Sequence, residues 1–224
     1  MKMILTAALS VVWSALLVGC ATESSQVVET SQVRAAATAH TYQGEKQRLI
    51  VGSFYNRSDY QNGIFSSGSD RLGSQAKTIL QTHLQQTGRF IVMDRDNMAQ
   101  IAEEAGLSGA QSAIQGANVI VTGDVTEFGR KVVGDRQLFG ILGSGKKQVA
   151  YAKVMLNVVD VNSSAILYSS QGAGEFELSN REVLGTGGTA SYDSTLNGKV
   201  LNLAISEAVD NLIVALEQKK WSTE

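Results

Sequence analysis

The 224-residue chain contains no proline, one cysteine and two histidines. Because a proline residue lacks the backbone N–H that a sheet ladder needs, its complete absence fits long, uninterrupted hydrogen-bonded strands. A single cysteine excludes an intramolecular disulfide and any metal cluster held by several cysteines. His40 and His83 offer little for an imidazole-based metal site, so we expect no metal centre.

The chain also lacks an excess of basic residues. Its 19 Lys and Arg residues stand against 21 Asp and Glu residues, which gives a formal net charge of -2 at pH 7. This balance does not favour nucleic-acid binding, which usually leaves a basic footprint. With 43% hydrophobic and 18% charged residues, the composition is that of globular protein, enough for one domain or two small ones.

Residues 1–19 are expected to be a lipoprotein signal peptide. Lys2 precedes an almost unbroken apolar run from Ile4 to Val18, which is shorter than the roughly 20 residues that a membrane-spanning helix needs. The run ends in the sequence LVGC, which matches the box that bacterial lipoproteins carry before their lipidated cysteine. We therefore expect Cys20 to carry acyl chains of the palmitate type, which would anchor the protein stably. Ala21 is not the Asp that usually retains lipoproteins at the inner membrane, so we expect an outer-membrane protein that faces the periplasm.

A polar tether is expected over residues 20–47, which are rich in Ser, Thr, Ala, Gln and Glu and show no clear hydrophobic period. Residues 48–124 read as the first part of an αβ core. A β-branched run begins at Leu49, a helix with apolar residues at helical spacing follows Asp70, and Phe90 opens a second strand. The next helix is expected to turn Met98, Ile101, Ala102 and Ala105 inward, and a third strand begins at Val119.

Residues 125–198 show little helical period and read as two long hairpins, over about 125–161 and 166–196, joined by a tight turn. Each arm spans around 12 to 18 residues, whereas strands in globular proteins usually have five or six. The expected tips are Gly143, Ser144, Gly145 and Lys146 in the first hairpin and Gly187 and Gly188 in the second. Residues 199–224 are expected to form a helix that completes the core, which makes the fold class α+β.

Three segments resemble the CsgG/HfaB family, the lipoproteins that form the curli secretion channel of the outer membrane. These are residues 84–95, which end in Asp94-Arg95, residues 118–123, and the pair formed by residues 138–141 and 148–161. The likeness extends over about residues 48–216. It implies a periplasmic αβ domain, and a ring of copies whose hairpins together form a transmembrane β-barrel.

The resemblance also implies a pore constriction built from the loop after the first strand. In this sequence that loop is residues 55–69, and its candidate constriction residues are Tyr60, Ile64 and Phe65. An equally weighted alternative is that these residues cover the edge of the domain as a hydrophobic plug.

Enzymatic chemistry is not expected. The sequence GILGSGKK at residues 140–147 approaches a phosphate-binding loop, but Lys147 stands where a Mg²⁺-binding hydroxyl is needed. The residues that follow read as a strand and not as the helix whose N-terminus would cradle phosphates. We expect no cofactor beyond the covalent lipid on Cys20.

Two functions remain open at this point. The first is an oligomeric secretion channel component that passes unfolded polypeptide to the cell surface. The second is a non-channel periplasmic lipoprotein adaptor that binds an envelope partner such as a cell-wall synthase. Expected partners are the outer membrane, further copies of the chain in a ring, and either secreted polypeptide or accessory envelope proteins; nucleic acid is not expected.

Overall fold

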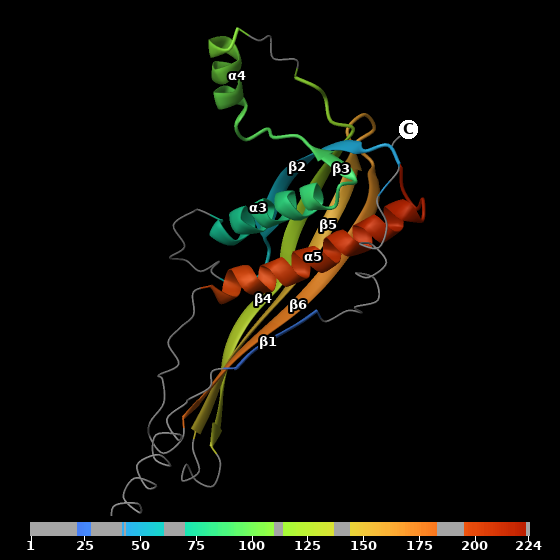
Figure 1. Ribbon diagram of the computed structural model, residues 1–224. Coiled ribbons are helices and arrows are strands. Elements are labelled where there is room, and N and C mark those ends of the chain that lie inside the picture. Colours follow the sequence, from blue (N-terminus) through green and yellow to red (C-terminus); the bar gives the residue numbers. More distant parts are fainter. Residues whose placement is uncertain are drawn as a thin grey trace, which may run out of the picture.

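The computed structural model describes residues 22–27, 42, 44–60, 70–109, 114–136, 144–182 and 195–222 (Figure 1). The elements in chain order are β1 (Thr22–Val27), β2 (Gln47–Asn56), α3 (Arg71–Gln86), β3 (Phe90–Val92), α4 (Met98–Leu107), β4 (Val119–Arg136), β5 (Ser144–Asp160), β6 (Ile166–Glu182) and α5 (Leu196–Glu217). The predicted α+β fold class is therefore confirmed.

One mixed sheet forms the scaffold, with the strand order β1-β6-β5-β4-β2-β3. Strand β2 pairs in parallel with β3 and β4, and the remaining pairs are antiparallel. Helices α3 and α5 lie against one face of this sheet, and β4, β5 and β6 continue past α5 as a long extension (Figure 1). The strand extension is the part of these strands beyond the core residues Phe128, Ala150 and Phe176, namely residues 129–136 of β4, 144–149 of β5 and 177–182 of β6.

The core lies between the helices and one face of the sheet. Along β5, buried Val154, Leu156 and Val158 alternate with Lys153, Met155 and Asn157, which is the pattern of a strand with one covered face. Helix α5 contributes an apolar stripe that includes the fully buried Leu201, Ile205 and Leu212. No helix among the described residues is both long and apolar enough to cross a membrane.

Helix α5 approaches β6 closely because two glycines leave room for its backbone. A Cβ on Gly172 would overlap the carbonyl oxygen of Ala204 and the backbone nitrogen of Ala208. A Cβ on Gly174 would lie 2.7 Å from the Cβ of Leu203. The helix therefore rests on strand backbone instead of on strand side chains.

The C-terminal end of the chain is fastened beside β3. Trp221 is 4% exposed, and its ring stacks on Phe90 with the centroids 6.5 Å apart. Next to it, the guanidinium of Arg89, itself 5% exposed, pairs with Glu217 and donates from Nη1 to the carbonyl oxygen of Thr87 at 3.0 Å. These contacts hold β3 to the end of α5.

The structure corrects the tether expected over residues 20–47. Thr22–Val27 form β1, which pairs antiparallel with β6 from Thr22 opposite Ser179 to Val27 opposite Gly174. A polar segment that cannot order by burial alone gains strand structure here because β6 offers its backbone as a template.

The structure also corrects the helix expected after Asp94. Met98, Ile101, Ala102 and Ala105 were expected to face inward, but no residue of α4 is buried. The reason is positional, since α3 and α5 already occupy the covered face and α4 stands away from the body beyond β3 (Figure 1).

The first predicted hairpin is confirmed, because β4 and β5 pair antiparallel from Val119 opposite Asp160 to Arg136 opposite Ser144. Of the second, only the first arm is described: it is β6, which pairs with β5 on one side and, over Gly174–Ser179, with β1 on the other. Residues 183–194, which hold the expected tip at Gly187 and Gly188, lie outside the described residues.

Candidate protein interface

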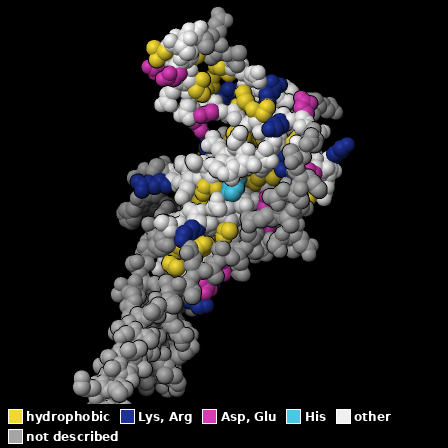
Figure 2. Space-filling view, viewed as in Figure 1, with side chains coloured by type: hydrophobic (Ala, Val, Ile, Leu, Met, Phe, Trp, Pro, Cys, Tyr) yellow, Lys and Arg dark blue, Asp and Glu magenta, His cyan; other side chains and the backbone are white. Residues whose placement is uncertain are grey.

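An arm projects from the body of the molecule between β3 and β4. It comprises residues 93–118, with α4 at its centre, and none of its described residues, 93–109 and 114–118, is buried. On the face seen in Figure 2, hydrophobic side chains gather over this arm beside acidic ones. A helix of ten residues is marginal in water by itself, and the described residues bury none of the side chains of α4.

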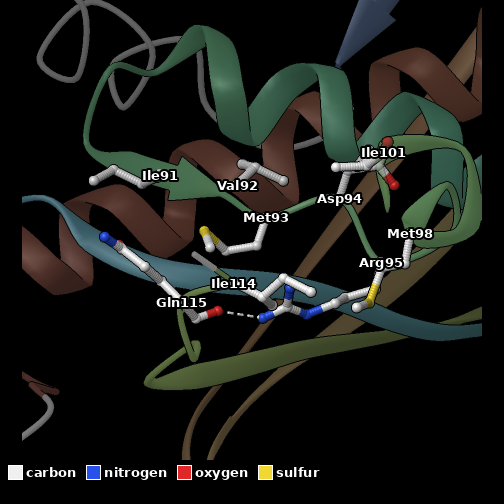
Figure 3. Close-up of a pocket in the computed structure, with 9 residues that line it drawn as sticks. All are labelled: Ile91, Val92, Met93, Asp94, Arg95, Met98, Ile101, Ile114 and Gln115. Atoms are coloured by element: carbon white, nitrogen blue, oxygen red, sulfur yellow. Dashed lines mark hydrogen bonds between the residues drawn. The ribbon is translucent and has the colours of Figure 1, made fainter. Parts of the chain in front are cut away.

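A groove of about 530 Å³ lies between the arm and the edge strand β3. Figure 3 shows Met93 and Ile114 lying toward each other in its middle, with Met98 and Ile101 on the α4 side. Its complete lining is Ile91, Val92, Met93, Asp94, Arg95, Met98, Ile101, Ile114 and Gln115. This mainly apolar lining and volume fall in the range of sites that take several side chains or a small ligand.

Hydrogen bonds within the arm hold the groove open. Arg95 donates from Nη2 to the carbonyl oxygen of Gln115 at 2.5 Å, which joins the two ends of the arm. The carboxylate of Asp94 accepts from the side chain of Asn97 at 2.6 Å and from the backbone nitrogens of Asp96 and Asn97. The side-chain bond from Asn97 is the main cause that lowers the pKa of Asp94, so the groove keeps a negative charge at its rim.

A row of apolar side chains crosses the uncovered face of the sheet. Ile50 lies opposite Ile120, Ile120 opposite Val159, and Val159 opposite Ile166, so the row joins β2, β4, β5 and β6. Residues on one strand alternate between faces, and their neighbours Leu49 and Val51 point into the core, so the row faces away from α3 and α5. It ends at Ile166, whose residue surface is 61% exposed.

Side chains close both lateral edges of the sheet near this row. At β6, the backbone N–H of Ala173 donates to Glu207 at 3.2 Å, and Asn211 donates to the carbonyl oxygen of Gln171 at 2.9 Å. At β3, the N–H of Val92 donates to Gln85 at 3.4 Å. Capped edges resist the addition of a further strand, so contacts at these edges are expected to be made by side chains.

The turn that carries Ile166 is rigid. The carboxylate of Asp160 accepts from the backbone nitrogens of Asn162 and Ser163 and from the hydroxyl of Ser163, and Ser164 adopts a left-handed φ of 60°. The backbone bond from Ser163 is the first cause that lowers the pKa of Asp160. The β5–β6 turn therefore holds its apolar neighbours in one geometry.

We expect the Asp160 turn to contribute stability that depends on pH. A carboxyl group whose pKa is lower in the folded state contributes stability above its unfolded pKa of about 3.9, and this contribution is lost as the pH falls through the folded value. Melting temperatures of the wild type and of Asp160→Asn, measured from pH 6 to pH 2.5, should differ above pH 4 and converge below it. A difference that stays constant over this range would contradict the assignment, and Asp59→Asn serves as a surface control.

The predicted constriction residues are only partly described. Tyr60 packs against the core, with its ring centroid 4.6 Å from that of Phe128 and its hydroxyl 3.4 Å from the Nδ2 of Asn197. This placement agrees with the alternative that the loop covers the domain edge. Ile64 and Phe65 lie outside the described residues, as does Cys20.

The predicted tip of the first hairpin is shifted. Ser144, Gly145 and Lys146 belong to β5 and pair with Arg136, Asp135 and Gly134, so they are ladder residues and not turn residues. Gly143 lies outside the described residues. A ring nitrogen of His83 lies 2.9 Å from the Oδ1 of Asn202, which links α3 to α5.

Sequence reasoning missed the arm and the apolar row. Both depend on pairing between distant strands, and the apolar period of residues 98–107 looks the same whether it faces a core or a partner. The available signal was the connection after α4, residues 108–118, which is longer than the usual connection of about 4–6 residues. Among the described residues, no group of three or more His, Cys, Asp or Glu is placed to hold a metal ion.

Comparison with known proteins identifies the relatives of the chain. The family model described as "Curli production assembly/transport component CsgG" matches residues 29–224. The chain belongs to the CsgG family. A candidate lipoprotein of Neisseria meningitidis serogroup B is 57% identical over 221 residues, which cover 99% of this chain and 98% of that protein.

Solved structures resemble this CsgG-family protein more distantly. A PelC dodecamer from Paraburkholderia phytofirmans is 13% identical, covers 86% of this chain and 97% of its own, and has a TM-score of 0.35. The C-terminal domain of LpoB from Salmonella enterica is 17% identical, covers 58% and 85%, and has a TM-score of 0.32. Both identities and both TM-scores are low, so these likenesses say nothing about what the CsgG-family protein binds or how it assembles.

Proposed function

We propose that this CsgG-family protein is an outer-membrane lipoprotein that assembles into a secretion channel and passes unfolded polypeptide to the cell surface. The observation that carries the proposal is the length of β4, β5 and β6. These strands have 18, 17 and 17 residues, whereas a transmembrane strand needs roughly 9–11. The strand extension accounts for 8, 6 and 6 of these residues, so a bilayer crossing would use the extension together with the adjoining part of each strand.

The pairing of β1 with β6 supports the proposal that the strand extension lies at the membrane. Thr22 lies opposite Ser179, three residues before β6 ends at Glu182. Cys20 precedes Thr22 by two residues. Two residues of extended chain span at most about 7 Å, which limits the distance between Cys20 and Thr22. A lipid on Cys20 would thus anchor the protein at the end of the molecule where the strand extension ends.

In this proposal a wide pore with a narrow constriction admits extended chains and holds back folded ones. Ile64 and Phe65 are the constriction candidates that remain, because Tyr60 is engaged with Phe128. The energy for transport comes from outside the protein, which acts without catalysis and without a cofactor other than its lipid.

A second candidate function is a periplasmic adaptor that docks an envelope partner such as a cell-wall synthase. One observation favours it. Strand β1 pairs with β6 along Gly174–Ser179, the edge that a returning strand of a second hairpin would need. With β1 in that place, the extension is a four-stranded sheet tethered to the membrane by its lipid.

One experiment separates these functions. The full-length lipidated protein, extracted in mild detergent, is imaged as single particles and reconstituted into planar bilayers. The channel proposal expects rings with a central hole and stepwise conductance. A monomer or small oligomer without conductance, with the strand extension open to protease in intact periplasm, would overturn the channel and leave the adaptor.

A further inference from the structure

The outer edge of β6 is closed in two different ways. Near the core, two side chains of α5 close it, because Glu207 accepts from the N–H of Ala173 at 3.2 Å and Asn211 donates to the carbonyl oxygen of Gln171 at 2.9 Å. From Gly174 to Ser179 the same edge is covered by β1. The first cap belongs to the body of the molecule, whereas the second is a separate strand near the N-terminus.

Strand β1 is the more easily removed of the two caps. Four of its six residues, Glu23, Ser24, Ser25 and Gln26, are not among the β-branched and aromatic types that favour strands. It is the outermost strand of the sheet and pairs with β6 alone. Its hydrogen bonds replace bonds that the same groups make with water, so their small net gain is set against the cost of ordering six residues.

A lipid on Cys20 limits where β1 can lie in the proposed channel. Acyl chains in the periplasmic leaflet of the outer membrane hold Cys20 at the periplasmic boundary of the bilayer. Thr22 follows two residues later, which is at most about 7 Å of extended chain. Thr22 must therefore lie within about 7 Å of that boundary.

Strand β6 cannot cross the bilayer and keep β1 paired under this limit. A crossing of roughly 9–11 residues that ends at Glu182 begins at about residues 172–174, which places Ser179 about two thirds of the way across. Because the hydrocarbon core is about 30 Å thick, Ser179 would then lie about 20 Å from the periplasmic boundary. Thr22 pairs with Ser179 and would lie at the same depth. The pairing of β1 and the crossing of β6 therefore exclude each other.

From this exclusion we propose that β1 is a latch on the edge of β6. Paired, it covers the edge and holds the strand extension at the periplasmic surface of the membrane; released, it lets the extension insert. The latch rests on the channel function proposed above and adds a step that controls it. The arrangement in Figure 1 is then the state before insertion.

Release of β1 opens only the part of the edge that would enter the bilayer, because the α5 cap at Gln171 and Ala173 stays in place. The freed edge must pair with another strand in the membrane, where unpaired backbone groups are costly. Strand β1 cannot be that strand, since its six residues are fewer than the roughly 9–11 that a crossing needs.

A disulfide that joins β1 to β6 tests the latch. Ser24 lies opposite Glu177, and opposite residues of antiparallel strands have Cα atoms about 4.5–5.5 Å apart, which suits a disulfide. Full-length lipidated Ser24→Cys/Glu177→Cys protein is added to planar bilayers before and after reduction; Cys20, the single native cysteine, is blocked by its lipid. We expect the oxidised protein to open at least tenfold fewer channels than the wild type, and reduction to restore them.

The matched control joins β5 to β6, a pairing that release of β1 leaves intact. Lys147 lies opposite Ser179, so Lys147→Cys/Ser179→Cys places a disulfide in the same part of the strand extension. Each double variant removes one partner of the 2.8 Å ion pair between Lys147 and Glu177, so both lose that pair equally. We expect the control to open as many channels oxidised as reduced.

The variant Ser24→Pro/Ser25→Pro makes the opposite change, because proline removes backbone N–H donors from β1 and weakens its pairing. We expect this protein to open channels severalfold faster than the wild type, with an unchanged melting temperature of the body. Loss of its channels would show that the channel needs β1, and would overturn the latch.

The outcomes separate the latch from the channel. If the oxidised Ser24→Cys/Glu177→Cys protein conducts like the wild type, the latch fails while the channel stands. A reduced form that does not conduct, together with a proline variant no faster than the wild type, would also overturn the latch. If the wild type and the control open no channels, the proposed channel function fails, and the latch fails with it.

Discussion

Replacement of Gly172 by alanine is expected to lower the free energy of unfolding by about 3 kcal/mol, at the upper end for an overpacked core. The added Cβ would overlap the backbone of Ala204 and Ala208, and backbone cannot move aside as a flexible side chain can. Helix α5 must then shift away from β6 and loosen the contacts of Leu201, Ile205 and Leu212 with the sheet. Urea unfolding followed by circular dichroism measures the change.

The matched control for this variant is Gly106→Ala. Gly106 lies in α4, and an added Cβ there meets nothing within 4 Å. Alanine is the better helix former by up to about 1 kcal/mol, so this change should be neutral or slightly stabilising. If both glycine variants show the same small effect, α5 does not rest on the backbone of β6 as described.

Replacement of Trp221 by alanine is expected to cost about 3–5 kcal/mol, the range for loss of a large buried aromatic side chain. Its ring is 4% exposed and stacks on Phe90, which belongs to β3. The cavity left by alanine would remove this contact and loosen the C-terminal end of the chain from β3. Differential scanning calorimetry of the variant should show a lower melting temperature and a smaller unfolding enthalpy.

The conservative variant Trp221→Phe distinguishes packing from hydrogen bonding. The indole Nε1 is buried and has no hydrogen-bond partner in the described part of the chain. Phenylalanine leaves a smaller cavity than alanine and also removes an unpaired polar group, whose burial costs about 1–3 kcal/mol. The two effects oppose each other, so we expect a change much smaller than that of alanine. A loss of stability as large as that of Trp221→Ala would contradict this expectation and indicate that Nε1 donates a stabilising hydrogen bond.

The local hydrophobic pattern was sufficient to predict a helix or strand wherever the segment packs against the core of its own chain. The long arm predicted within residues 125–161 is present as β5, whose Val154, Leu156 and Val158 alternate with Lys153, Met155 and Asn157 and are buried. Helix α3 begins after Asp70, whose side chain accepts from the backbone nitrogen of Gly73, as the sequence leads one to expect. These features depend on neighbours in sequence, and their physical causes act over one or two turns.

Pattern alone failed where the outcome depends on which strand pairs with which. Residues 22–27 read as part of a polar tether, yet they form β1 and pair with β6, which is distant in the chain. Likewise, the apolar positions of α4 predicted burial, because a helix that faces a partner has the same period as one that faces a core. The loop residues Ile64 and Phe65 carry no period at all, so their role as a constriction stays a prediction.

The amino-acid sequence by itself determined the α+β class, the long strands, the lipidation signal expected at Cys20 and the resemblance to the CsgG family, because each is written in composition, local periodicity or a short motif. Only the tertiary structure decided that α5 rests on Gly172, that Ile50, Ile120, Val159 and Ile166 form one row, and that the arm stands free beside it. These features arise from register and from contacts between residues far apart in the chain. A pattern of hydrophobic residues specifies that a surface must be covered, but only the folded chain shows which surfaces are still uncovered.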